Sequence, residues 1–276
     1  AIKKDQKGKE NNKKYGVVTK YTGNISKKIS KEIYDLMDMV AKPLQVQIRI
    51  VDDITQNGYY NKETGTITVS MNSKNPMLTV FSHETLHHLK QISPKAYQTF
   101  ENAVINYMQT NHANEFKERI EEYRNNYYKA IDSGEIKLSK DKITDQYLYE
   151  EVVANCTGLF FDDEQAIEEY VNKHNKESKS LLQAIKETLS NILKALKNIK
   201  PGTKEEKMLL SCKEDFENLQ SMFWNLMNEG AKAKVDLSTE IGDTPTEFKN
   251  VEDVSDSEVP FSLKEDSEGN KLSEKQ

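Results

Sequence analysis

The chain has 276 residues, with 39 basic and 45 acidic side chains and a formal net charge of −6. Only 36% of the residues are hydrophobic and 30% are charged, and no stretch reaches the roughly 18 apolar residues of a membrane span, which excludes an integral membrane protein. Two cysteines, Cys156 and Cys212, are too few for a disulfide framework or a thiolate metal cluster.

The charge is spread unevenly along the chain. Residues 1–14 hold six lysines and two acidic residues, whereas residues 231–276 hold six lysines and twelve acidic residues. The part between them is net negative and lacks the basic face that nucleic-acid binding requires. We therefore predict a basic flexible segment over 1–23, a globular part over 24–229 and an acidic disordered tail over 230–276.

The first elements of the globular part alternate between helix and strand patterns. Apolar residues recur at helical spacing over 26–41, and Pro43 is predicted to end that helix. Alternation of period two over 44–51 indicates a half-buried strand. Two further strand-like runs, at 58–60 and 66–71, flank a turn that ends in glycine, which predicts a hairpin.

The rest of the globular part has helical patterns. Asn75-Pro76 is typical of an N-cap followed by proline in the first turn, and it predicts a helix to about Gln91. A capping box at Thr203–Glu206 predicts a last helix to about Glu229. The fold class is therefore α+β and mainly helical, with a helical hairpin at its C-terminal end. The other predicted helices cover 94–110, 113–132, 144–160 and 178–199.

Three of the five histidines fall within six residues, and two of them form the motif His83-Glu84-x-x-His87. A chain of this composition contains that motif by chance in about one case in a hundred. Because positions i and i+4 lie one helical turn apart, His83 and His87 can bind one metal ion. Glu84 lies about 100° further round the helix. From there it can take a proton from a metal-bound water and pass it to a leaving amine.

A catalytic zinc site needs a third protein ligand and an open position for water. His112 lies beside a predicted helix break and His174 in a polar stretch, so both are predicted to be surface residues. The helix 144–160 is mostly apolar but carries the pair Glu150 and Glu151. A carboxylate of this pair is therefore the candidate third ligand.

Glu151 is the favoured ligand of the two. Ala154 is small enough to let two helices approach, and Asn155 on the same face could accept the second N–H of a ligating histidine. Glu150 lacks such a helper and stays open as an alternative ligand or as a residue that supports the ligands. The donor to the developing oxyanion is unassigned. The candidates are His88, Tyr147 and Tyr149, and Tyr127 and Tyr128 are further possibilities.

Two motifs together resemble a known family. His83-Glu84-x-x-His87, followed on a later helix by Glu151-x-x-x-Asn155, is similar to the gluzincin branch of the zincin metallopeptidases, in which the last position is often Asp. By this resemblance His83, His87 and Glu151 would bind one zinc ion per chain, Glu84 would be the catalytic base, and Asn155 would orient a ligating histidine. More loosely, the chain is similar to metallopeptidase segments of phage and mobile-element polyproteins, which favours the cytoplasm of a bacterial host.

The resemblance covers about 25–160. It implies a zincin core over 24–162, made of a small sheet, the motif helix and the glutamate helix. It implies that strand 66–71 is an edge strand that pairs with an extended substrate. Residues 163–229 would form a helical extension. The expected function is a zinc-dependent endopeptidase acting on a peptide or protein substrate, with no nucleic-acid or membrane partner. The alternative is a catalytically idle structural or interaction module of the same fold, against which the intact Glu84 argues.

Overall fold

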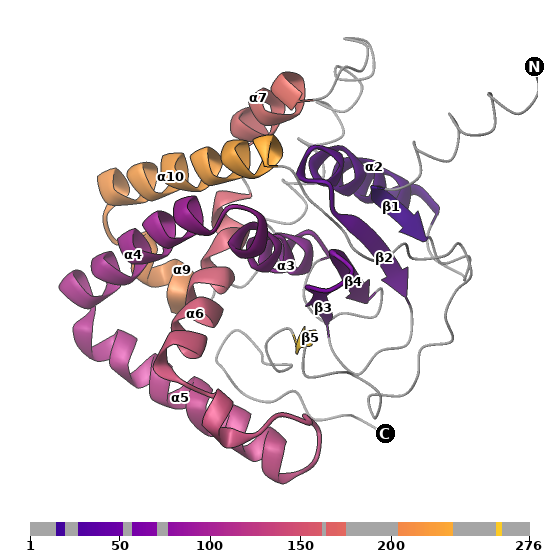
Figure 1. The fold of residues 1–276 in the computed structure, drawn as a ribbon. Coiled ribbons are helices and arrows are strands. Elements are labelled where there is room, and N and C mark those ends of the chain that lie inside the picture. The colour runs from indigo at the N-terminus through magenta and orange to yellow at the C-terminus, as the bar shows by residue number, and fades with distance from the viewer. Residues whose placement is uncertain are drawn as a thin grey trace, which may run out of the picture.

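The computed structural model describes residues 15–19, 27–51, 57–70, 77–161, 164–174, 204–233 and 258–260. Within these ranges the protein is α+β and mainly helical, as predicted, with a small sheet on one side of a group of helices (Figure 1). No helix among the described residues combines the length and apolar character needed to cross a membrane. Other predictions lie outside the described residues. They are the helix 178–199, the Asn75-Pro76 N-cap, the capping-box side chains of Thr203 and Glu206, and most of the flexible segments 1–23 and 230–276.

Among the described residues the sheet has five strands, in the order β1-β2-β4-β3-β5. β1, β2 and β4 run parallel, β3 runs antiparallel to β4, and β5 runs antiparallel to β3. The predicted hairpin is confirmed as β3 and β4, joined by a turn in which Gly65 has a φ of 61°. The strands are β1 (Gly16–Thr19), β2 (Gln47–Val51), β3 (Gly58–Asn61), β4 (Thr66–Ser70) and β5 (Glu258–Pro260).

The prediction that strand 66–71 lies at the sheet edge is wrong. β4 pairs with β2 on one side and with β3 on the other, so it is an interior strand. All five of its residues are buried. An interior strand of a covered sheet needs no polar face, and the β-branched run of β4 fits that position.

Two strands lie in segments predicted to be flexible or disordered. β1 falls within 1–23 and pairs with β2, and β5 falls within 230–276 and pairs with β3. Both strands are short, and their partners are distant in sequence, so local periodicity carries little sign of them. The predicted flexible segments are therefore too long at these two places.

The described helices agree closely with the predicted ones up to residue 160. The segment 203–229 was predicted to be one helix, but it contains two helices, which are separated at residues 210–212. The helices are α2 (Lys27–Leu44), α3 (Met77–Ile92), α4 (Pro94–Asn111), α5 (Ala113–Asp132), α6 (Asp145–Phe160), α7 (Glu164–His174), α9 (Lys204–Leu209) and α10 (Lys213–Lys232), with a short 3-10 turn η2 (Lys140–Lys142).

Pro43 does not end α2, because the helix continues to Leu44 with the proline in its last turn. The end is set by Gln45, which has a left-handed φ of 56°. The N–H of Val46 then donates to the carbonyl of Ala41 at 3.3 Å, and the N–H of Gln45 donates to that of Lys42 at 3.1 Å. These two bonds form a Schellman motif, which satisfies carbonyls that the helix end would leave unpaired.

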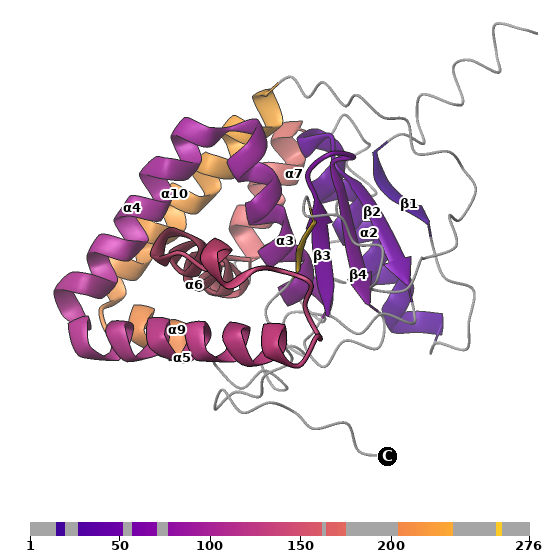
Figure 2. The ribbon, with the colours of Figure 1, turned by 60° about the horizontal axis from the view of Figure 1, so that its bottom comes forward.

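Helix α3 is the central element of the protein. It contacts β3 and β4 on one side and α6 on the other, and α2, α4 and α10 complete its surroundings (Figure 2). Gly230 lets α10 approach closely, since a Cβ at that position would lie 2.4 Å from Cδ2 of Leu89 on α3. The helix that carries the histidine motif is thereby fixed from several directions.

Candidate metal centre

Two helices bring the candidate ligands together. His83 and His87 lie one turn apart on α3, and Glu151 extends from α6, the helix packed across from it. One ligand atom from each of the three residues lies within 4.8 Å of the other two. Nε2 of His83 is 3.7 Å from Oε2 of Glu151, and Nε2 of His87 is 3.8 Å from Oε1. The structure thus groups the three residues that the sequence selected as ligands.

The chemistry of this donor set fits a metal ion. Nε2 of His87 and both carboxylate oxygens of Glu151 are buried, and none of them has a hydrogen-bond partner in the described part of the chain. Buried polar atoms without partners are costly, and a bound cation would satisfy all three. Bonds of about 2.0–2.1 Å to a tetrahedral zinc place neighbouring ligand atoms about 3.4 Å apart, close to the separations found here.

His87 is held by a direct contact with a carboxylate. Its Nδ1 donates to Oε1 of Glu150 over 2.9 Å, and the other oxygen of Glu150 accepts from Lys90. This contact leaves Nε2 of His87 facing Glu151. Glu150 is therefore not placed as a ligand, because it binds the nitrogen of His87 that faces away from Glu151. It has the position of a residue that orients the ligand and raises its basicity.

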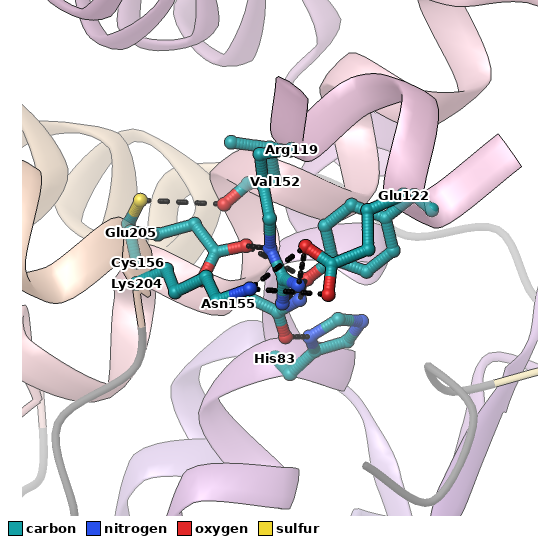
Figure 3. A network of polar contacts seen from close by, with 9 residues as sticks. His83, Arg119, Glu122, Val152, Asn155, Cys156, Lys204 and Glu205 are labelled. Atoms are coloured by element: carbon teal, nitrogen blue, oxygen red, sulfur yellow. Dashed lines mark hydrogen bonds and ion pairs between the residues drawn. The ribbon is translucent and has the colours of Figure 1, made fainter. Parts of the chain in front are cut away.

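His83 is held by Asn155, as the sequence predicted. Its Nδ1 donates to Oδ1 of Asn155 over 3.0 Å, which leaves Nε2 toward Glu151. Asn155 in turn contacts Tyr123 of α5, and Tyr123 contacts Glu205 of α9 (Figure 3). Tyr123 and Glu205 were not among the predicted residues, because no local pattern links a tyrosine and a glutamate 82 positions apart.

Glu84 lies beside the three ligands and against the sheet. It is 0% exposed, and neither carboxylate oxygen makes a hydrogen bond within the described part of the chain. A Cβ built on Gly58 of β3 would lie 3.7 Å from Oε1 of Glu84, so this strand passes close to the carboxylate. A glycine is required here because β3 passes close to α3 and β4, so that the same Cβ would lie only 2.5 Å from Cγ1 of Val80 and 2.7 Å from the carbonyl oxygen of Thr68.

The electrostatics of the cluster favour an added positive charge. Burial raises the pKa of Glu84 well above its ordinary value and raises the pKa of Glu151 to about 7, although the charge of His87 opposes both shifts. Burial lowers the pKa of His83 well below its usual range, so that imidazole is neutral. Burial would also lower the pKa of His87, but its hydrogen bond to Glu150 and the charges of the three glutamates raise it to about 9. Burial thus disfavours the negative charge of Glu84 and Glu151, and a bound cation would favour it again.

The three unassigned candidates occupy different places. Both ring nitrogens of His88 are engaged elsewhere, with Tyr60 at 2.9 Å and the carbonyl of Leu44 at 2.8 Å, so His88 joins α3 to the sheet and α2. Tyr149 packs on Phe116, with ring centroids 5.5 Å apart. Tyr147 is the one of the three whose pKa depends on the charges of the cluster. Its hydroxyl is buried without a hydrogen bond among the described residues, and burial, followed by the charge of Glu151, raises its pKa well above the ordinary value.

The remaining histidines and the cysteines do not join this cluster. His112 and His174 are half-buried and bond Ser211 at 2.8 Å and Asn228 at 2.7 Å. They are therefore less exposed than predicted. Cys156 is buried and Cys212 is half-buried.

Comparisons with protein-family models, with curated proteins and with solved structures find no match to this chain. Function is therefore inferred from the geometry and chemistry of the centre itself.

Proposed function

We propose that the protein is a zinc-dependent endopeptidase. The observation that carries this proposal is the buried convergence of His83, His87 and Glu151 within 4.8 Å, with the unpartnered carboxylate of Glu84 beside them. Two imidazoles and one carboxylate leave a fourth tetrahedral position open, which is the arrangement of catalytic rather than structural zinc. A zinc ion held there would polarise a peptide carbonyl and lower the pKa of a water molecule.

The chain's own residues supply the remaining chemistry. Glu84 accepts the proton of the attacking water and delivers it to the amine that leaves. Its burial favours this role, because a carboxylate whose pKa is raised is a stronger base than one in water. Tyr147 lies one helical turn before Glu151 and faces the same cluster, so its hydroxyl is the donor that we assign to the developing oxyanion.

The outer side of β3 is the edge that suits an extended substrate. β3 runs along α3 and passes Glu84 at Gly58, and its outer side already pairs with another strand, β5. A peptide that replaced β5 would form main-chain hydrogen bonds with β3 and would run antiparallel to it. This pairing selects an unfolded, extended segment, which favours an endopeptidase with a peptide or unfolded protein as its substrate.

An idle module with the same fold is the competing function. A structural metal site needs no additional buried carboxylate without a partner, so Glu84 favours the enzyme. The test is the zinc content of protein purified without chelators, together with cleavage of an unfolded protein before and after chelation. We expect about one zinc per chain, loss of cleavage on chelation, and recovery when zinc is returned. Zinc without cleavage would favour the idle module, and a folded protein that rejects added zinc would exclude both metal-dependent roles.

A further inference from the structure

A buried chain of hydrogen bonds connects His83 to a carboxylate on a distant helix (Figure 3). From His83 the chain passes to Asn155 of α6, then to the hydroxyl of Tyr123 on α5. The Tyr123 hydroxyl donates to Oε1 of Glu205 on α9 over 2.8 Å. Glu205 is 0% exposed and forms an ion pair with Arg119, whose Nε lies 2.7 Å from Oε1 of the glutamate. Three helices and the motif helix thus meet in one polar network.

In each hydrogen bond between His83 and Glu205, only one assignment of donor and acceptor is possible. The carboxylate of Glu205 can only accept, so the single proton of the Tyr123 hydroxyl points to it. The hydroxyl oxygen must then accept from Nδ2 of Asn155, and Oδ1 of Asn155 must accept from Nδ1 of His83. The sequence of donors therefore holds His83 as the tautomer protonated at Nδ1, with the lone pair of Nε2 directed at Glu151.

We infer that Glu205 and Tyr123 are positioning residues for the metal ligand His83. Asn155 is neutral, so it cannot supply the negative charge that His87 receives directly from Glu150. Glu205 acts through the direction of the hydrogen bonds instead, because Arg119 balances its charge and also donates to the Tyr123 hydroxyl over 3.1 Å. The inference rests on the proposed metal centre. It gives α9, which lies in the helical region after residue 163, a role in orienting a metal ligand.

A purely structural role for the network predicts a different result. The Arg119–Glu205 pair joins α5 to α9, and removing either partner of a buried pair destabilises a protein whatever its function. Glu101 is the matched control, since it is also a buried carboxylate that accepts from a tyrosine, Tyr97, at 2.8 Å, but it belongs to α4 and is bonded to Gln98 and Gln146 instead of to the network.

The first test measures Zn²⁺ affinity by competition with a chromophoric chelator, and thermal unfolding of the metal-free protein. We expect Glu205→Gln to weaken Zn²⁺ binding about 10-fold and Glu101→Gln to leave it unchanged. Adding Asn155→Asp to Glu205→Gln should recover affinity, because the carboxylate then contacts His83 itself. Equal destabilisation of both single variants with unchanged Zn²⁺ affinity would overturn the inference.

The second test needs no metal. In the metal-free protein, ¹⁵N spectra of the imidazoles should show His83 protonated at Nδ1, with a slowly exchanging proton. Tyr123→Phe removes the hydroxyl but keeps the ring, whose centroid lies 4.2 Å from Cζ of Arg119. That proton should then exchange faster. A His83 protonated at Nε2 would overturn the inference even if the protein proved to bind no zinc, an outcome that would separately defeat the proposed function.

Discussion

Nδ1 of His87 lies 2.9 Å from Oε1 of Glu150, and this contact separates the two adjacent glutamates of α6 into different roles. Glu150 holds the far nitrogen of the imidazole, whereas Glu151 faces the near nitrogens of both histidines. The pair with His87, supported by Lys90, keeps the pKa of Glu150 at about 2 although burial would raise it. One carboxylate is thus held as an anion that orients a ligand, and its neighbour is left available to a cation.

The first prediction concerns these two glutamates. Glu151→Ala should reduce bound zinc from about one per chain to near zero, because it removes one of three protein ligands. Glu150→Ala should keep the stoichiometry but weaken Zn²⁺ binding by about 10–100-fold, because His87 loses its orienting acceptor. Elemental analysis and chelator competition measure the two effects. The ligand assignment is reversed if Glu150→Ala is the variant that loses its zinc.

The second prediction concerns Glu84. Glu84→Gln removes the proton acceptor but keeps the size of the side chain, so cleavage of an unfolded protein should fall by about 10²–10⁴-fold. Zinc content should not change, since Glu84 is not one of the three grouped ligands. Thermal unfolding should shift upward if at all, because a neutral amide is easier to bury than a carboxylate of raised pKa. Cleavage that survives this change would contradict the proposed role of Glu84.

The third prediction distinguishes two tyrosines two positions apart. Tyr147→Phe should lower kcat by about 10²-fold with little change in KM, because the hydroxyl acts on the developing oxyanion and not on the bound substrate. Tyr149→Phe is the matched control, since Tyr149 packs on Phe116. It should leave both constants unchanged. Equal kinetics for the two variants would remove Tyr147 from the mechanism.

The sequence was sufficient for the elements that have local signals. The i, i+4 spacing of His83 and His87, and the run Glu151-x-x-x-Asn155, predicted residues that the structure groups, because both patterns are set by the geometry of single helices. The helix boundaries near α4, α5 and α6 follow apolar periodicity and agree with the prediction.

The parts that were missed depend on contacts between distant segments. No local pattern in β4 indicates that β2 pairs with it. Its interior position, in which all five residues are buried, could therefore not be predicted from the sequence. Glu205 and Tyr123 meet because α9 packs near α5 and α6, and no spacing rule encodes that meeting. Glu150 differs from Glu151 only in the direction that α6 gives each side chain.

The last prediction concerns the tail strand β5. It pairs antiparallel with β3, with Glu258 opposite Asn61 and Pro260 opposite Tyr59, so it runs toward the end of β3 that approaches Glu84. The candidate ligands are at most 4% exposed, and β5 lies on the edge of the sheet that we assign to the substrate. A strand tethered to the same chain competes at high effective concentration. We therefore expect β5 to act as a built-in competitor of the substrate.

The double substitution E258P/V259P tests this competition. It produces three consecutive prolines, which lack the N–H groups that a strand needs for pairing. KM for an extended peptide should fall severalfold with kcat little changed, and the backbone amides of residues 58–61 should exchange hydrogen faster when no substrate is present. D253P/V254P makes the same two kinds of substitution outside β5 and should have neither effect. Unchanged exchange at β3 would show that β5 does not occupy the edge, whereas faster exchange with an unchanged KM would show that the substrate binds elsewhere.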